Sequence, residues 1–212
     1  MPELHIAKHG EGAPLVLLPP APHTGAFFAP LLPELEGMQA CSVDYPGYGG
    51  SAPVAAPSIA AYADAIIPHI PAGAHLLGFH TGTLVAVEIA RRAEVGAVVL
   101  IDIPAFGAAK RAELADKFSA PNPDRNNDAF LAAFAYDAYA EFPKLAKPVS
   151  VIATQSGLLE LTREAAALLP DAQLTELLDV TAPAFEGHAA RLADTVLILV
   201  NQHGEAAHRV RP

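Results

Sequence analysis

Short, fully apolar runs alternate along the chain with stretches of helical periodicity. The apolar runs are typical of buried strands, and they predict strands over 15–18, 41–43, 75–77, 98–101, 149–153 and 174–178. Between them the pattern predicts helices over 27–35, 58–70, 84–90, 158–169 and 189–200, with Ser58 as an N-cap. Strands that alternate with helices indicate an α/β protein, with a mostly parallel sheet covered by helices on both faces.

One long segment interrupts this alternation. Between Asp102 and Pro148 lies an irregular stretch that contains Pro121, Pro123 and a predicted helix over 130–142. Connections of this length without strands are uncommon, and they usually carry a function. We therefore interpret residues 103–147 as a lid-like insert within a single domain that spans residues 1–212.

Composition narrows the classes of partner. Apolar residues make up 52 % of the 212 residues and charged residues 17 %, which is typical of a globular chain. The formal net charge of −10 argues against a nucleic-acid partner, because phosphate binding needs clustered Lys and Arg. No apolar run reaches the ~18 residues of a membrane span. The remaining expectation is a small-molecule substrate or ligand, and the sequence leaves the oligomeric state open.

The expected compartment is the cytoplasm. The N-terminus lacks the basic-then-apolar pattern of a secretion signal. Cys41 is the one cysteine of the sequence, so no internal disulfide can form, which fits a reducing compartment.

Three motifs point to a known architecture. They are Gly78-Phe79-His80-Thr81-Gly82 after a predicted strand, the loop Asp44-Tyr45-Pro46-Gly47-Tyr48-Gly49-Gly50-Ser51, and Gly187-His188 just before the last predicted helix. In this order they resemble the α/β-hydrolase superfamily over nearly the whole chain, with its elbow G-x-S-x-G, its loop D-x-P-G-x-G-x-S and the place of its histidine. The resemblance implies the α/β-hydrolase fold with a short lid insert and without the first strand of the family.

The departures from the family pattern define the candidate site. The elbow presents His80 where the family has serine, and Gln155-Ser156-Gly157 offers no carboxylate where the acid usually stands. The resemblance then implies His80 and His188 as the catalytic pair, with Asp102 as a substitute acid that orients His188.

The oxyanion loop of the family has a counterpart here as well. Its usual opening His-Gly is replaced by Pro19-Pro20. The backbone N–H groups of Ala21 and Thr81 are the candidates for an oxyanion hole, and His23 is expected to face the same pocket.

Each candidate residue also has a purely structural interpretation. His80 could be a buried structural histidine, although backbone strain usually persists where it serves a function. His188 could be an ordinary loop histidine, and Asp102 could cap the turn after its strand. A three-histidine zinc site from His23, His80 and His188 is a further alternative, but the spacings are not those of metal ligands. We therefore predict no metal and no other cofactor.

Two functions stay open at this point. The first is a hydrolase-like enzyme acting on a small, largely apolar ester, lactone or carbonyl compound, with His80 and His188 performing acid–base or acyl-transfer chemistry. The second is a catalytically silent, ligand-binding relative that kept the fold. If the two histidine rings meet, their protons should come off as those of a coupled pair. Because the hydroxyl nucleophile is absent, we expect weak turnover of simple aryl esters.

Overall fold

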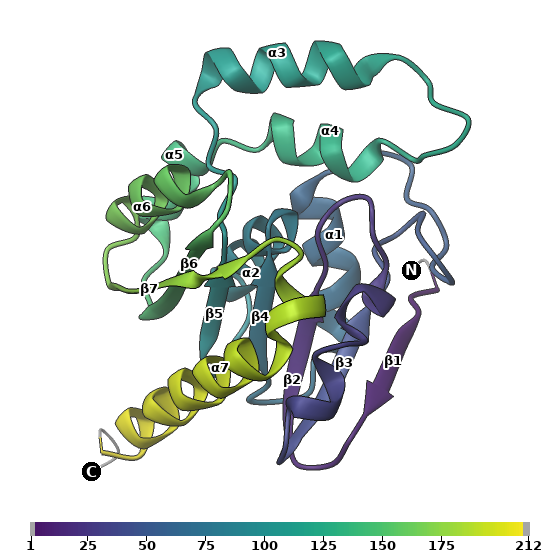
Figure 1. Cartoon of the computed structure of the whole chain (residues 1–212). Coiled ribbons are helices and arrows are strands. Elements are labelled where there is room, and N and C mark those ends of the chain that lie inside the picture. Colours follow the sequence, from purple (N-terminus) through teal and green to yellow (C-terminus); the bar gives the residue numbers. More distant parts are fainter. Residues whose placement is uncertain (1–2, 210–212) are drawn as a thin grey trace.

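The computed structural model describes residues 3–209, which form a seven-stranded sheet flanked by helices (Figure 1). The strands are β1 (Ile6–His9), β2 (Ala13–Leu18), β3 (Met38–Val43), β4 (His75–Phe79), β5 (Val98–Ile101), β6 (Val149–Gln155) and β7 (Ala172–Thr181). Their order across the sheet is β1-β3-β2-β4-β5-β6-β7. Only β1 runs antiparallel to its neighbour within this sheet. The predicted mostly parallel α/β sheet is confirmed.

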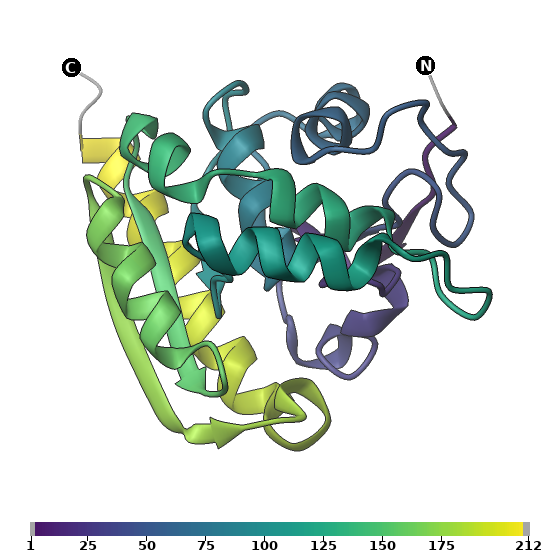
Figure 2. The same ribbon diagram turned by 90° about the horizontal axis from the view of Figure 1, so that it is seen from above.

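Helices cover both faces of the sheet. They are α1 (Ile59–Ile66), α2 (Thr81–Ala90), α3 (Ala108–Ser119), α4 (Asp128–Ala135), α5 (Ala138–Glu141), α6 (Leu159–Leu168) and α7 (Ala184–Arg209). Short 3-10 helices add η1 (Gly25–Phe28), η2 (Leu32–Glu34), η3 (Ile67–His69) and η4 (Phe142–Lys144). In Figure 1, α7 lies in front of the sheet, and Figure 2 shows α3 and α4 side by side across the top of the molecule. No described helix is long and apolar enough to cross a membrane.

Alternating side chains along the strands fill two separate cores. On β2, Val16 and Leu18 belong to the core beneath α1 and α2, whereas Leu15 and Leu17 belong to the core beneath α7. This division follows from the two-residue period of a strand, which sends successive side chains to opposite faces. A strand buried on both faces is apolar at every position, which explains why the central strands appear in the sequence as uninterrupted apolar runs.

Prolines account for two differences from the predicted helices. The predicted helix over 27–35 is wrong, because η1 and η2 stand there as two separate 3-10 turns. Pro30 and Pro33 lack the backbone N–H that a continuous helix would need at those positions. The predicted N-cap is confirmed, since the Ser58 hydroxyl accepts a hydrogen bond from the Ala61 N–H at 3.0 Å. That helix gives way to η3 at Ile67, with Pro68 in its first turn.

Other differences lie where the sequence lacks an apolar stripe. The insert contains α3 and α4 and not a single helix over 130–142, and α3 has no buried residue. Strand β1 was not predicted, because its residues are exposed or half-buried. At the other edge of the sheet, β7 is longer than the predicted strand over 174–178. The last helical element, α7, begins at Ala184 but is broken at His188, so its continuous part starts at Ala189, where the sequence predicts it.

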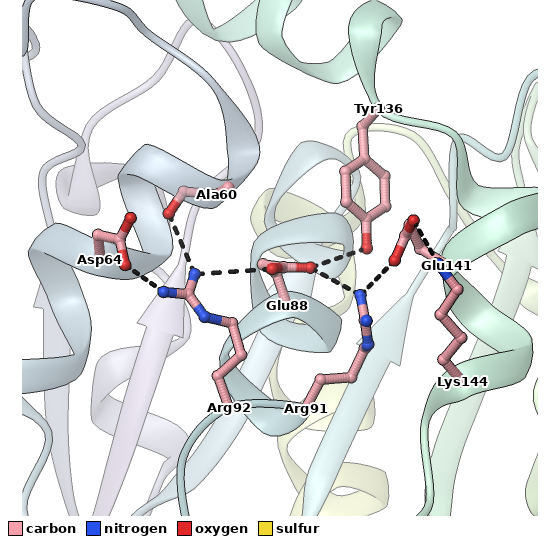
Figure 3. Close-up of polar contacts among 8 residues, drawn as sticks. All are labelled: Ala60, Asp64, Glu88, Arg91, Arg92, Tyr136, Glu141 and Lys144. Carbon is pink, nitrogen blue, oxygen red and sulfur yellow. Dashed lines mark hydrogen bonds and ion pairs between the residues drawn. The ribbon is translucent and has the colours of Figure 1, made fainter.

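Glu88 of α2 links the insert to the body of the protein (Figure 3). Its carboxylate lies 3.1 Å from Arg91 and 3.6 Å from Arg92, and it accepts a hydrogen bond from the Tyr136 hydroxyl at 3.4 Å. Arg91 also reaches Glu141 at 2.5 Å. Burial, aided by the neighbouring Glu88 carboxylate, raises the pKa of Tyr136, so this hydroxyl stays a donor. Helices α2 and α5 and the segment before α5 are therefore joined by one network.

Replacing Glu88 with alanine should destabilise the protein. The substitution leaves two partly buried guanidinium groups without this carboxylate, and we expect a loss of about 1–3 kcal/mol in the free energy of unfolding. Denaturant unfolding measures this directly. The control is Glu36→Ala, an exposed position where the change should stay below about 0.5 kcal/mol. Equal midpoints for the two variants would show that the network does not stabilise the fold.

Candidate active site

His80 stands in a sharp turn between β4 and α2. Its backbone angles are φ 48° and ψ −116°. Its N–H donates to the Ile101 carbonyl at 3.0 Å, and its carbonyl accepts from the Thr83 N–H at 2.9 Å and the Thr83 hydroxyl at 2.6 Å. The elbow expected from the motif Gly78-Phe79-His80-Thr81-Gly82 is therefore a tight turn with a positive φ at His80, and these hydrogen bonds hold it in place.

The two glycines around His80 are required by close packing. A Cβ atom on Gly82 would lie 1.9 Å from the Leu18 carbonyl oxygen of β2, and one on Gly78 would lie 2.5 Å from the Gly82 carbonyl oxygen. Real Cβ atoms do not approach this closely, so larger residues would push α2 away from the sheet. The two glycines of the motif Gly78-Phe79-His80-Thr81-Gly82 therefore allow the turn to pack closely against the backbone of β2 and of α2.

Asp102 occupies the corresponding place on the adjacent strand. It directly follows β5, which pairs in parallel with β4, and its backbone also has a positive φ, 53°. The buried carboxylate accepts hydrogen bonds from the Thr154 N–H at 2.8 Å and the Thr154 hydroxyl at 2.5 Å. Among residues 3–209, His80 and Asp102 are the non-glycine residues with positive φ. Such strain tends to collect at functional sites.

Both strained residues line one cavity of about 980 Å³. Its walls are mainly apolar, and three phenylalanine rings, Phe27, Phe79 and Phe185, contact one another with centroids 5.0–5.4 Å apart. The His80 ring stacks on Phe79 at 4.2 Å. A large apolar cavity with a few convergent polar groups is the usual form of a small-molecule site.

The His80 imidazole is neutral at pH 7. Burial lowers the pKa of His80 to about 4; the Asp102 carboxylate raises it and His23 lowers it, but burial has the largest effect. A neutral ring keeps a nitrogen lone pair, which can accept a proton or attack a carbonyl carbon. Asp102 lies where it would stabilise the ring once a proton has been accepted.

The structure brings His23, His80 and Asp102 together. His23 is exposed, lines the same cavity and has its ring 5.0 Å from that of Phe27, as expected for a residue facing this pocket. His188 is not among the residues that line the cavity. It lies where α7 is interrupted, with φ −135° and ψ 23°, and its Nε2 is 3.5 Å from the Thr181 hydroxyl.

The roles predicted for His188 therefore lack support from this geometry. Its predicted place just before the last helix agrees with the break in α7 at His188, after which the helix continues. The pairing of His80 with His188, and the orientation of His188 by Asp102, stay predictions. Among the side chains that the structure describes, no three His, Cys, Asp or Glu residues gather to hold a metal ion, so the zinc alternative has no support either.

Ala21 and Thr81 are not among the residues that line the cavity. Thr81 is the first residue of α2, and the first N–H groups of a helix have no acceptor within the helix. The N–H of Thr81 follows His80 directly in the chain. The oxyanion hole predicted from Ala21 and Thr81 stays a prediction.

Several lining residues were not named as candidates from the sequence. Among them are Thr154, Phe185 and Glu186. Thr154 ends a predicted strand and lies in the region where site residues were expected, so its position was a usable signal. Phe185 and Glu186 lie in the first turn of α7, which the sequence placed outside any helix.

Comparison with known proteins agrees with this architecture. No family model matches the chain. A pimeloyl-[acyl-carrier protein] methyl ester esterase from Shewanella sp. (strain MR-7) is 38 % identical over 91 residues, which is 43 % of this chain and 34 % of that protein. The same enzyme of Shewanella oneidensis (strain MR-1) is 36 % identical over 87 residues, or 41 % of this chain and 33 % of that protein. The chain thus matches about a third of the length of these relatives.

Solved structures align over most of the chain. A lipase-esterase related protein from Clostridium acetobutylicum ATCC 824 has a TM-score of 0.79 at 15 % identity, covering 93 % of this chain and 99 % of its own. The enol-lactonase from Burkholderia xenovorans LB400 has a TM-score of 0.75 at 21 % identity, and the alignment covers 94 % of this chain and 97 % of the enol-lactonase chain. The chain therefore has the α/β-hydrolase fold, with a histidine at the turn between β4 and α2.

Proposed function

We propose that this protein hydrolyses small, largely apolar esters or lactones, with His80 as the central group. The observation that carries the proposal is the placement of the two strained residues, His80 and Asp102, on one apolar cavity. The sequence relatives are named as methyl ester esterases, and one structure with the same fold is an enol-lactonase. These names support bond cleavage at an ester carbonyl.

His80 would act as the proton acceptor. As water attacks the ester carbonyl, one of its protons passes to the His80 ring, and a tetrahedral intermediate forms. Collapse of that intermediate breaks the bond to the alcohol, which leaves with the proton held by His80, so the ring returns to its neutral form. The Asp102 carboxylate stabilises the imidazolium between these steps.

Asp102 serves His80 in this proposal and not His188. Asp102 and His23 are the titratable neighbours that move the His80 pKa, whereas His188 contacts Thr181. The backbone N–H groups of Ala21 and Thr81 would bind the oxyanion. A proton acceptor with a low pKa is a weak base, so the turnover should be slow, in agreement with the weak ester hydrolysis expected from the missing hydroxyl.

The proposal is tested with butyrate and hexanoate esters of p-nitrophenol and with a γ-lactone. We expect slow turnover by the purified protein that exceeds the rate of the His80→Ala variant. Mass spectrometry of the protein during turnover separates two routes, because direct attack by His80 would add the mass of the acyl group. Binding of these compounds without any turnover above the variant would contradict the proposal and favour a silent, ligand-binding protein.

A further inference from the structure

We infer that the cavity selects ligands that combine an apolar body with a positive charge, such as a protonated tertiary amine. As a statement about ester substrates, this inference rests on the proposed function and names the class of ester. As a statement about ligand binding, it rests on the lining of the cavity alone.

The first observation is the charge of the lining. The titratable residues around the cavity are the two carboxylates Asp102 and Glu186 and the two histidines His23 and His80, with no lysine and no arginine. Within the described part of the chain, neither carboxylate forms an ion pair with a basic side chain. The hydrogen-bond donors on Asp102 both belong to Thr154, which is neutral. A carboxylate in an apolar wall without a lysine or arginine partner favours a cationic ligand and disfavours an anionic one.

The second observation is the aromatic wall. Phe27, Phe79 and Phe185 form a contiguous group of rings on the cavity, and Phe106 adds a ring from the insert. The face of a phenyl ring carries partial negative charge, which attracts a cation, most strongly when the cation has left water. The neutral His80 ring brings no opposing positive charge to this wall.

Glu186 is the second carboxylate of the lining. It is exposed, lines the cavity and lies in the first turn of α7. A carboxylate there also stabilises the N-terminus of the helix. Binding of a cationic ligand by Glu186 can be separated from its stabilisation of the α7 N-terminus, because only ligand binding depends on the charge of the ligand.

The test uses three butyrate esters of nearly equal shape. Their alcohols are 3-(dimethylamino)propanol, 4-methylpentanol and 4-hydroxybutanoate, which carry a positive, a neutral and a negative end. At pH 8, where an ordinary histidine is neutral, we expect kcat/KM to fall in that order, by about tenfold or more from first to last. Calorimetric binding of the three free alcohols should follow the same order, and the differences should shrink at high salt.

Variants sharpen the result. Glu186→Gln should lower the preference for the amine over the neutral ligand by about three- to tenfold. Asp194→Asn changes an exposed carboxylate of the same helix away from the cavity and should leave the preference unchanged. Binding in the expected order without hydrolysis would overturn the proposed function but support the inference. Hydrolysis at equal efficiency for all three esters would overturn the inference and leave the proposed function standing.

Discussion

Replacing His80 with alanine should lower kcat/KM for hydrolysis of an apolar ester by about 10²–10⁴-fold, the usual contribution of a positioned proton acceptor. The ring is the neutral imidazole on the cavity, and its backbone is fixed by hydrogen bonds to Ile101 and Thr83. Alanine keeps the fold but removes the nitrogen lone pair. Steady-state kinetics with p-nitrophenyl butyrate measure the loss.

The matched control is His9→Ala. His9 is an exposed histidine of β1. Its removal should leave kcat/KM within about a factor of two of the wild-type value, because surface substitutions away from the site usually have small effects. Circular dichroism of both variants checks that they fold. If the His80→Ala protein is folded and turns over as fast as the wild type, a residue other than His80 must be the proton acceptor.

Replacing Gly82 with alanine should produce the largest loss of stability. The new Cβ would meet the Leu18 carbonyl oxygen at 1.9 Å, and neither the strand nor the helix backbone can yield without displacing its neighbours. Overpacking of this kind costs about 3 kcal/mol. For a chain of this size that corresponds to a fall of about 6–12 °C in the melting temperature, measured by calorimetry.

Gly107→Ala is the control for the glycine substitution. Gly107 precedes α3, is exposed, and a Cβ there would meet nothing within 4 Å. We expect its melting temperature to stay within about 4 °C of the wild type, because alanine is a poorer N-cap than glycine by roughly 1 kcal/mol or less. A Gly82→Ala protein as stable as this control would show that α2 is not pressed against β2.

The sequence predicted those parts of the fold whose residues are buried on both sides. The central strands β2, β4, β5 and β6 appear as apolar runs because both faces of the sheet are covered. Strand β1 and helix α3 were missed for the opposite reason, since their side chains are exposed or half-buried and leave no apolar pattern. The prediction of a helix over 27–35 was wrong because the spacing of its apolar residues is helical, whereas Pro30 and Pro33 prevent a continuous helix.

The candidate site was predicted in part. The glycine pair around His80 identified the turn, since only glycine fits where the backbone of α2 meets β2. Asp102 was selected from its place at a strand end, and the structure sets it beside His80. His188 was selected from its place before a helix, but the residues that end β7 and begin α7 determine where its ring lies. Such three-dimensional placement depends on loop geometry that periodicity does not encode.

The most direct test of a neutral His80 as the proton acceptor is the pH profile of kcat/KM for an apolar ester. The protonated ring cannot accept a proton, so activity should be lost as the pH falls through the His80 pKa and should be constant above it. Burial places that pKa at about 4, so we expect full activity from pH 7 down to about pH 5 and a half-maximal rate near pH 4, with the fold intact by circular dichroism. A half-maximal rate near pH 6.5, the ordinary value for histidine, would rule out the buried His80 ring as the proton acceptor, because the acceptor would then be a histidine in contact with water.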